Sequence, residues 1–402
     1  MASETRSAER HINLILPIDN ASEMWYTAFE SAPKALMQTF SCFEDEEFLG
    51  SDVGALPGDE DRVNMSLTLE GIAKLAGVSR STVSRVVNDH PSVRDQVRER
   101  VWEVIHETGY QPHAAARSLV TRRTHIIGAV IPQAVMTLFV DPFFPLLLCG
   151  ITETCNDHGY HLMLSLFNDP ATEEELYRRL VHSGHLDGVI VASTRMDDPL
   201  IPTLLGDGVP FILVGRHSDS RAGYVDVDNV GGARMAVEHL IRLGHRRIAT
   251  VTGPLSMASG EDRLAGYCQA LEAHRISVQE ALIVEGDFTE GSGAMGMQRL
   301  LSASPTAVFV ASDTMAIGTL KALREADLRV PEDVALVSFD DIPVAAALEP
   351  ALTTVRQPIE RLGSMAADLL LNLLENPPDT QAPAHRIILP AKLIVRDSCG
   401  AM

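Results

Sequence analysis

The chain has little cysteine, and the cysteines it has follow no ligand pattern. Five cysteines are spread over 402 residues, with no C-x-x-C pair and no histidine at metal-ligand spacing. Scattered cysteines argue against a disulfide framework and a zinc site, and they fit a reducing cytosol. We therefore expect no metal, no cofactor and a cytoplasmic location.

Segments that would direct the chain to a membrane are also absent from the sequence. The apolar run at 11–18 is not preceded by a basic stretch, so it does not resemble a signal peptide. The longer apolar stretch at 126–151 contains Pro132, Asp141 and Pro145. Because a spanning helix needs about 20 apolar residues without such breakers, we expect no membrane partner.

Positive charge is scarce except in one segment. The formal net charge is −21, yet residues 66–125 carry nine Lys and Arg against six Asp and Glu, or +3. Residues 1–64 carry four against thirteen, or −9, which leaves −15 for the remainder. Phosphate binding needs local charge rather than a basic protein. The acidic composition therefore does not exclude nucleic acid as a partner.

The sequence pattern divides the chain into four parts. These are an acidic extension at 1–65, three short helices at 66–110, a basic bridge at 111–124 and a long segment at 125–402. In the long segment, short apolar runs alternate with helical stretches, which indicates doubly wound parallel sheets. Its length of about 275 residues favours two similar α/β lobes with a cleft between them.

The expected strands and helices of the long segment can be placed individually. The predicted strands lie at 126–131, 161–166, 188–192, 211–214, 248–252, 281–284, 307–311 and 335–338. The predicted helices lie at 145–158, 173–183, 230–243, 263–274, 314–326 and 359–374. Their alternation in sequence predicts that helices cover both faces of each sheet.

Residues 68–88 have the pattern of a helix-turn-helix. Thr68 can cap a first helix, Gly77 can end it in a left-handed conformation, and Ser79 can cap the second. A third helix is expected from a capping motif at Ser92 and Asp95. Polar and basic side chains then lie on the outer face of the second helix, where Arg can read guanine in the major groove. The spacing alone fits an ordinary helical hairpin equally well, but the local positive charge favours DNA binding.

The basic bridge has the composition of a segment that becomes helical on DNA. Pro112 is followed by about two turns of Ala, Arg and Leu, too short for a stable isolated helix. Leu119 is an apolar residue among Arg117, Arg122 and Arg123. Such a residue can act as a wedge in the minor groove, whereas a plain linker would not need it.

These motifs resemble the lactose-repressor (LacI/GalR) family. The run T-L-E-G-I-A-K-L-A-G-V-S-R-S-T-V-S-R-V-V-N at 68–88 and A-A-R-S-L at 115–119 carry the resemblance, which extends over 66–396. It implies a homodimer, with a tetramer left open, that reads a palindromic double-stranded operator. The family usually has Asn where this chain has His113, which could make the bridge sensitive to pH or sequence. The expected DNA-binding residues are Thr68, Ser79, Arg80, Ser81, Thr82, Ser84, Arg85, Asn88, His113, Ala116, Arg117 and Leu119.

The long segment carries candidate ligand-binding groups at the carboxyl ends of its predicted strands, where open α/β sheets bind ligands. Arg and Asp can hydrogen-bond vicinal hydroxyls, and a Phe face can cover an apolar sugar surface. Each group alone fits a structural role, as Asp313 could simply cap the following helix. The resemblance adds Arg263 and implies a periplasmic-binding-protein-like sensor with a sugar or nucleoside-like effector. The expected effector-binding residues are Asp141, Phe143, Phe144, Arg216, Arg263, Phe288, Ser312, Asp313 and Asp340.

Other functions fit the sequence less well. The G-x-G-x-x-G at 291–296 occurs late in the chain and six residues after a strand, so a helix start rich in small residues is favoured over a dinucleotide site. A solute-binding protein would need an export signal or anchor and no DNA reader. No nucleophile, metal or acid–base set supports an enzyme. We therefore expect a transcriptional regulator, most simply a repressor, whose operator affinity depends on an effector.

The extension at 1–65 lies outside the resemblance. Its acidic composition suggests disorder rather than a packed module. One interpretation is a start codon assigned upstream of the true one, since translation beginning at Met65 would match the family. The other is an acidic arm that competes with operator phosphates for the basic segment. We favour the first interpretation.

Overall fold

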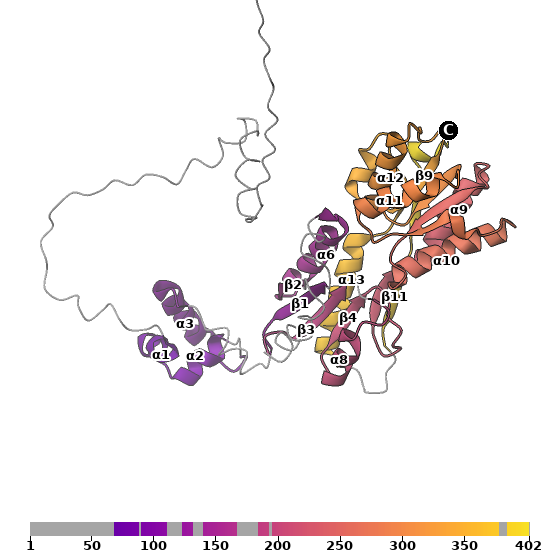
Figure 1. Cartoon of the computed structure of the whole chain (residues 1–402). Helices are drawn as coiled ribbons and strands as arrows, with labels where there is room; N and C mark the ends of the chain where they lie inside the picture. Colours follow the sequence, from indigo (N-terminus) through magenta and orange to yellow (C-terminus); the bar gives the residue numbers. More distant parts are fainter. Residues whose placement is uncertain are drawn as a thin grey trace, which may run out of the picture. The chain divides into compact units, whose positions relative to one another are not determined.

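The structure is a computed structural model that describes residues 68–87, 90–110, 123–131, 140–166, 184–192, 195–377 and 384–401. The predicted extension 1–65, most of the bridge 111–124 and the predicted helix 173–183 lie outside these residues. The chain divides after Ser66 into two units, and every described residue belongs to the second (Figure 1). That unit contains a group of three helices and, after the bridge, two α/β lobes.

The three helices are α1 Leu69–Ala76, α2 Arg80–Val87 and α3 Asp95–Thr108. Thr68 Oγ1 accepts a hydrogen bond from Gly71 N, and Ser79 Oγ accepts one from Thr82 N. Gly77 ends α1 with φ 66°, a conformation that a residue with a Cβ rarely adopts. The predicted caps of the first two helices are therefore confirmed. Their shared core consists of Ile72, Ala73, Ala76, Val83, Val86, Val101, Ile105 and Tyr110.

The predicted cap of the third helix is wrong. Helix α3 begins at Asp95, its N-cap residue is Arg94, and no side chain caps it. The Ser92 hydroxyl instead hydrogen-bonds His90 Nδ1 at 2.8 Å. Asp95 still lies in the first turn, where a carboxylate is favoured by the helix dipole.

The first lobe is built on a six-stranded sheet in the order β11-β5-β4-β3-β1-β2, with every pair parallel. Alternate strand residues point to opposite faces and form two separate hydrophobic clusters. Helices α6 and α13 cover one face, and α8 covers the other. The strands are β1 Ile126–Ile131, β2 His161–Leu166, β3 Gly188–Ala192, β4 Phe211–Val214, β5 Tyr224–Val227 and β11 Arg386–Leu389; the helices are α6 Phe143–Asp157, α8 Leu200–Asp207 and α13 Ile359–Glu375.

The second lobe has the same plan, with strand order β12-β10-β9-β8-β6-β7. Only the edge strand β12 is antiparallel to its neighbour. Helices α9 and α10 cover one face, and α11 and α12 cover the other. The strands are β6 Ile248–Thr252, β7 Ile283–Glu285, β8 Ala307–Val310, β9 Ala335–Asp340, β10 Thr353–Arg356 and β12 Lys392–Ile394; the helices are α9 Asn229–Arg242, α10 Ala258–Ala273, α11 Glu290–Leu301 and α12 Asp313–Glu325.

The chain passes between the lobes three times: between β5 and α9, between β10 and α13, and between β11 and β12. Each lobe is therefore assembled from separate stretches of sequence. Two of these passages place Asp226, Asn229 and Gln357 at the junction of the lobes. The expected fold, two doubly wound parallel-sheet lobes following a helix-turn-helix, is confirmed.

Five predicted strands, at 126–131, 161–166, 188–192, 211–214 and 248–252, match the structure residue for residue. Two others differ only at their ends, because β8 stops at Val310 and β9 continues to Asp340. The prediction at 281–284 is partly wrong, since Glu280–Leu282 forms a 3-10 turn before β7. The prediction missed α8 and the strands β5, β10, β11 and β12, and it began α10 five residues late, at 263.

Helices α6 and α13 approach closely through glycine. A Cβ added at Gly150 of α6 would lie 1.9 Å from the Glu360 carbonyl oxygen of α13. A Cβ at Gly363 of α13 would lie 2.2 Å from the Leu147 carbonyl oxygen of α6. The backbones of α6 and α13 therefore approach each other too closely for a side chain at either glycine.

Candidate functional site

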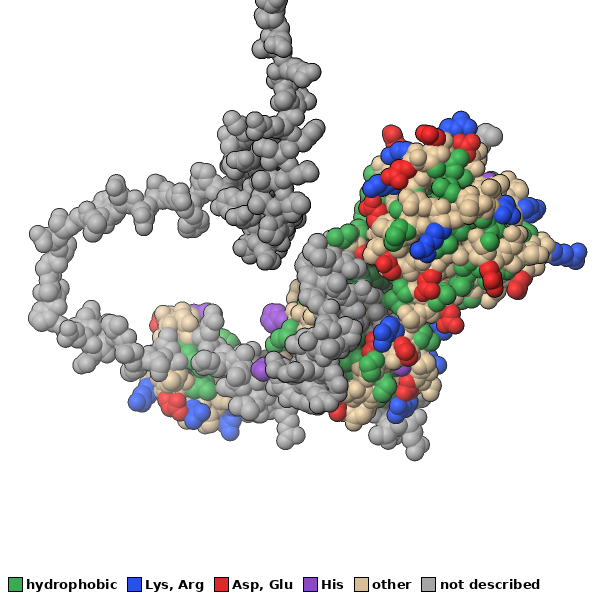
Figure 2. Space-filling view, viewed as in Figure 1, with side chains coloured by type: hydrophobic (Ala, Val, Ile, Leu, Met, Phe, Trp, Pro, Cys, Tyr) green, Lys and Arg blue, Asp and Glu red, His purple; other side chains and the backbone are tan. Residues whose placement is uncertain are grey.

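The α2 helix presents a polar face opposite its buried valines. Ser79, Arg80, Ser81 and Arg85 are exposed, and we call these four residues the reading face. Thr82 and Ser84 are partly buried beside it. Figure 2 shows Lys and Arg side chains along the visible edge of the three-helix group. An exposed helix with short polar and Arg side chains at its N-terminal end can enter a major groove.

Contacts within the three-helix group hold this face in place. Ser79 Oγ lies 2.8 Å from both Ser81 Oγ and Thr82 Oγ1. Arg80 Nη1 lies 3.0 Å from Glu70 Oε1 of α1, with both side chains mostly exposed. Since exposed ion pairs contribute little stability, Arg80 can exchange this partner for DNA at small cost. The predicted residues Asn88, His113, Ala116, Arg117 and Leu119 lie outside the described residues.

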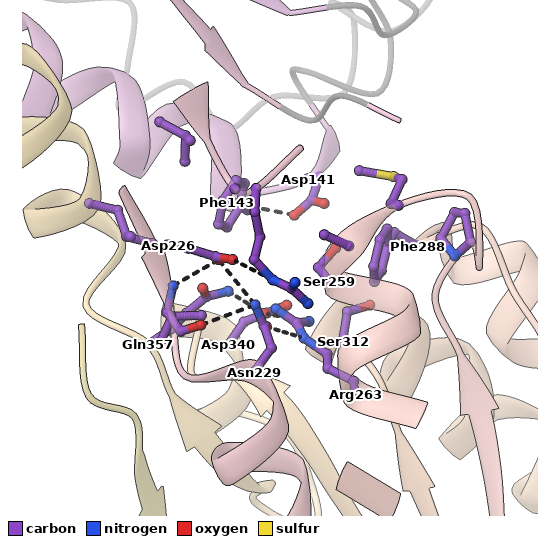
Figure 3. Close-up of a pocket in the computed structure, with 18 of the residues that line it drawn as sticks. Asp141, Phe143, Asp226, Asn229, Ser259, Arg263, Phe288, Ser312, Asp340 and Gln357 are labelled. Atoms are coloured by element: carbon purple, nitrogen blue, oxygen red, sulfur yellow. Dashed lines mark hydrogen bonds and ion pairs between the residues drawn. The ribbon is translucent and has the colours of Figure 1, made fainter. Parts of the chain in front are cut away.

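A second candidate site is a pocket between the two lobes (Figure 3). Eight of the nine predicted effector-binding residues line it, and they come from both lobes. Asp141 precedes α6, and Phe143 and Phe144 are the first two residues of that helix. Arg216 follows β4, and Arg263 belongs to α10. Those eight residues are Asp141, Phe143, Phe144, Arg216, Arg263, Phe288, Ser312 and Asp340.

Asp313 is the exception and requires a correction. Its side chain is fully buried and does not line the pocket. It accepts hydrogen bonds from Ser338 Oγ at 2.5 Å, Ile342 N at 2.9 Å and Thr354 Oγ1 at 2.7 Å. Asp313 therefore ties α12 to β9 and β10 and has a structural role.

Arg263 forms the centre of a buried polar network on the second lobe. Its Nε donates to Asn229 Oδ1 at 2.9 Å, and its Nη1 donates to the Ala311 carbonyl at 2.5 Å and to Asp340 Oδ1 at 3.3 Å. The guanidinium also stacks 3.8 Å from the centre of the Phe339 ring. Burial raises the pKa of Asp340, while the positive charge of Arg263 lowers it.

A second ion pair joins the two lobes at the pocket. Arg216, which follows β4 of the first lobe, donates through Nε and Nη2 to both carboxylate oxygens of Asp262 on α10 of the second lobe. Its Nε also lies 3.8 Å from Asp226 Oδ2 at the end of β5. Burial raises the pKa of Asp226 to about 6, and the nearby Asp262 charge adds to this effect. Arg216 is thus shared by carboxylates of both lobes.

Two further contacts bridge the lobes. Thr314 Oγ1 of α12 lies 3.4 Å from Asp141 Oδ1, and Met196 N donates to the Ser256 carbonyl at 2.8 Å. Burial raises the pKa of Asp141, although Phe143 N donates to its carboxylate. The pocket therefore combines carboxylates, guanidinium groups, amides and Phe rings, which can hydrogen-bond hydroxyls and cover an apolar ring face.

Several lining residues were missed by the sequence analysis. Asp226 lies in β5, Asn229 begins α9 directly after it, and Gln357 follows β10; neither strand was predicted. Gln357 Nε2 donates to Asp340 Oδ1 at 2.6 Å, so it belongs to the same network as Arg263. The β-branched run at Thr353–Arg356 before Gln357 was the signal that could have revealed it.

Other kinds of site are not found in the described part of the chain. No group of three or more potential ligands there could hold a metal ion. None of the helices described has the length and apolar composition needed to cross a bilayer. The G-x-G-x-x-G motif at 291–296 lies inside α11 and not in a turn before a helix, so it has no phosphate-binding geometry.

Comparisons with known proteins identify relatives over most of the chain. Residues 68–113 match the family of bacterial regulatory proteins, lacI family, and residues 237–399 match a periplasmic binding protein-like domain. The transcriptional regulator CelR of Thermobifida fusca is 42% identical over 336 residues, which cover 82% of this chain and 98% of that protein. A solved complex of CelR with cellobiose has a TM-score of 0.66 and 39% identity, covering 83% of this chain and 99% of that one. The lac repressor dimer bound to operator and the anti-inducer ONPF has a TM-score of 0.74 and 30% identity, with the same coverage.

Proposed function

Because the chain belongs to the LacI family of bacterial transcriptional regulators, we propose that it represses transcription by binding operator DNA, and that a carbohydrate bound between its lobes alters this binding. The observation that carries the proposal is the presence of both sites on one chain. One is the exposed reading face of α2, and the other is the polar and aromatic pocket between the lobes. The mechanism needs no chemical step, and it places the protein in the cytoplasm with its DNA.

The pocket supports coupling between the two binding events. Its lining comes from both lobes, which are also bridged by Arg216 with Asp262 and by Asp141 with Thr314. A ligand that contacts both lobes favours the arrangement in which all its contacts form. A palindromic operator requires two reading faces at fixed spacing, so we propose a homodimer in which lobe movement changes that spacing.

Substitutions on the reading face test the DNA-binding half of the proposal. Arg80→Ala should reduce affinity for an operator, selected from random DNA with the wild-type protein, by about 5- to 150-fold, because one good base contact contributes about 1–3 kcal/mol. Arg100→Ala is a matched control, since Arg100 is an exposed Arg of the same helical group on α3. Fluorescence anisotropy on operator and unrelated DNA measures both. Equal small losses for the two variants would contradict the proposed reading role.

The bridge is proposed to act as a wedge in the minor groove, on the basis of sequence alone. Leu119→Ala should weaken operator binding far more than binding to unrelated DNA, because only the specific complex inserts the side chain. The same anisotropy measurement compares the two DNAs. An equal loss on both would refute the wedge.

Thermal unfolding of the full chain with a panel of sugars and nucleosides tests the effector half. A ligand present at about 100 times its Kd should stabilise the folded protein by about 2.7 kcal/mol. Any ligand found should then change operator affinity in the anisotropy assay. A ligand that stabilises the protein without changing DNA affinity would contradict the coupling.

A further inference from the structure

The charges of the pocket between the lobes are unbalanced. Among the residues that the structure describes, its lining contains two guanidinium groups, those of Arg216 and Arg263, and no other Lys or Arg. It contains four carboxyl groups, which belong to Asp141, Asp226, Asp287 and Asp340.

The positive charge of Arg263 is already paired with a buried carboxylate. Arg263 is 5% exposed, and Asp340 lies against it at 3.3 Å. It also donates hydrogen bonds to the Asn229 side chain and the Ala311 carbonyl. An anion approaching Arg263 would therefore also approach the carboxylate of Asp340.

Arg216 is the more accessible guanidinium, with a side chain 33% exposed. Asp262 takes both its Nε and its Nη2, and the Asp226 carboxylate lies 3.8 Å from the same Nε. Asp262 itself does not line the pocket and is 9% exposed. Asp262 belongs to α10 of the opposite lobe. It therefore neutralises the positive charge of Arg216 from a position outside the pocket.

We propose that the pocket selects uncharged carbohydrates and excludes carboxylated or phosphorylated ones, and that Asp262 determines this selectivity by neutralising Arg216. This inference rests on the proposed function for the class of ligand, but its charge argument is independent. An anion in the pocket would lose its hydration and find each guanidinium already paired, with further carboxylates nearby. Uncharged hydroxyls avoid this cost and can still hydrogen-bond the same carboxylates.

Two variants separate this role from a general loss of charge. Asp262→Asn keeps the size of the side chain and one acceptor oxygen while removing the negative charge, so that Asp226 at 3.8 Å is the one carboxylate still beside Arg216 among the contacts described above. Glu261→Gln removes one negative charge from the neighbouring position of α10, where the residue is exposed and outside the pocket lining. The thermal unfolding of both variants and of the wild type is measured first without ligand.

The test compares matched neutral and anionic sugars on the full chain by calorimetric titration. The probes are cellobiose with cellobiouronate and glucose with glucuronate, pairs that differ by a carboxylate in place of a hydroxymethyl group, at constant ionic strength because salt screens charges. In the wild type and in Glu261→Gln, the anionic member should bind at least about tenfold more weakly than its neutral partner. In Asp262→Asn this preference should shrink by about tenfold or more. An anionic sugar that binds the wild type as tightly as its neutral partner overturns the proposal.

Sulfate distinguishes failure of this inference from failure of the proposed function. The rise in unfolding temperature that sulfate causes should be larger for Asp262→Asn than for the wild type and Glu261→Gln, because only in that variant has Arg216 lost its bidentate carboxylate partner, keeping Asp226 at 3.8 Å. If no neutral sugar binds while this sulfate effect appears, the carbohydrate assignment fails and the role of Asp262 stands. If sulfate acts on all three proteins equally, or if the sugar preference of Asp262→Asn is unchanged, Asp262 is not the determinant.

Discussion

Replacing Arg263 with methionine should expose how strongly the buried network holds the second lobe together. Arg263→Met keeps an unbranched side chain of similar length, so the space beside Phe339 remains largely filled. It removes the donors to Asn229, the Ala311 carbonyl and Asp340, all of them buried. The main consequence is that the Asp340 carboxylate, which is 5% exposed, loses its cationic partner.

Breaking a buried ion pair by removing one partner costs about 3–5 kcal/mol, because the remaining charge stays buried. The loss should depend on pH. Burial raises the pKa of Asp340, and removing Arg263 raises it further, since the nearby positive charge opposes that shift. An acid whose folded-state pKa lies above its unfolded value destabilises the protein at high pH, and this penalty disappears as pH falls through the folded pKa.

Urea unfolding at about pH 8 and about pH 5 measures both effects. We expect Arg263→Met to lose about 3–5 kcal/mol at the higher pH and clearly less at the lower pH. Adding Asp340→Asn to Arg263→Met should recover part of the lost stability at about pH 8, because no unpaired buried charge then remains at this position. A loss below about 1 kcal/mol, or an equal loss at both pH values, would refute the reasoning.

Two other predictions concern packing. Gly150→Ala should destabilise the first lobe by about 1–3 kcal/mol or more in urea unfolding, because its Cβ would lie 1.9 Å from the Glu360 carbonyl oxygen. Gly206→Ala, in a helix with nothing within 4 Å of the added Cβ, should be neutral or stabilising, and equal losses would contradict the close approach. Ile72→Ala should cost about 2–5 kcal/mol, comparable to the whole stability of a small three-helix unit. Operator binding should therefore fail while calorimetric unfolding of the lobes is unchanged; Leu75→Ala, at a site 57% exposed, should keep DNA binding.

The sequence was most informative where structure is decided locally. Thr68, Gly77 and Ser79 mark the ends of α1 and α2 because caps and left-handed glycines act within one turn. Central strands such as β3 were placed correctly because strands buried on both faces appear as continuous apolar runs. The edge strand β11 was missed although it contains Ile387, Ile388 and Leu389, because so short an apolar run is a weak local signal and its pairing with β5 joins residues far apart in the sequence.

The roles of Asp313 and Asp340 could not be distinguished from local sequence. Both residues lie at or just beyond the carboxyl end of a central strand, and their sequence positions predict the same role for both. Only the tertiary structure separates them, because Ser338 and Thr354 donate to Asp313 inside the lobe, while Arg263 and Gln357 hold Asp340 at the pocket wall. Contacts between distant residues decide which of two similar carboxyl groups can meet a ligand.

The sequence by itself determined the class of protein, since the helix-turn-helix pattern, the local positive charge and the alternation of strands and helices are all properties of short segments. It could not determine how the charges of the pocket are compensated. Arg216 and Asp262 are 46 residues apart and belong to different lobes. Their pairing exists only because the chain crosses between the lobes and brings the end of β4 against α10. Tertiary structure thus decided which charges remain available to a ligand.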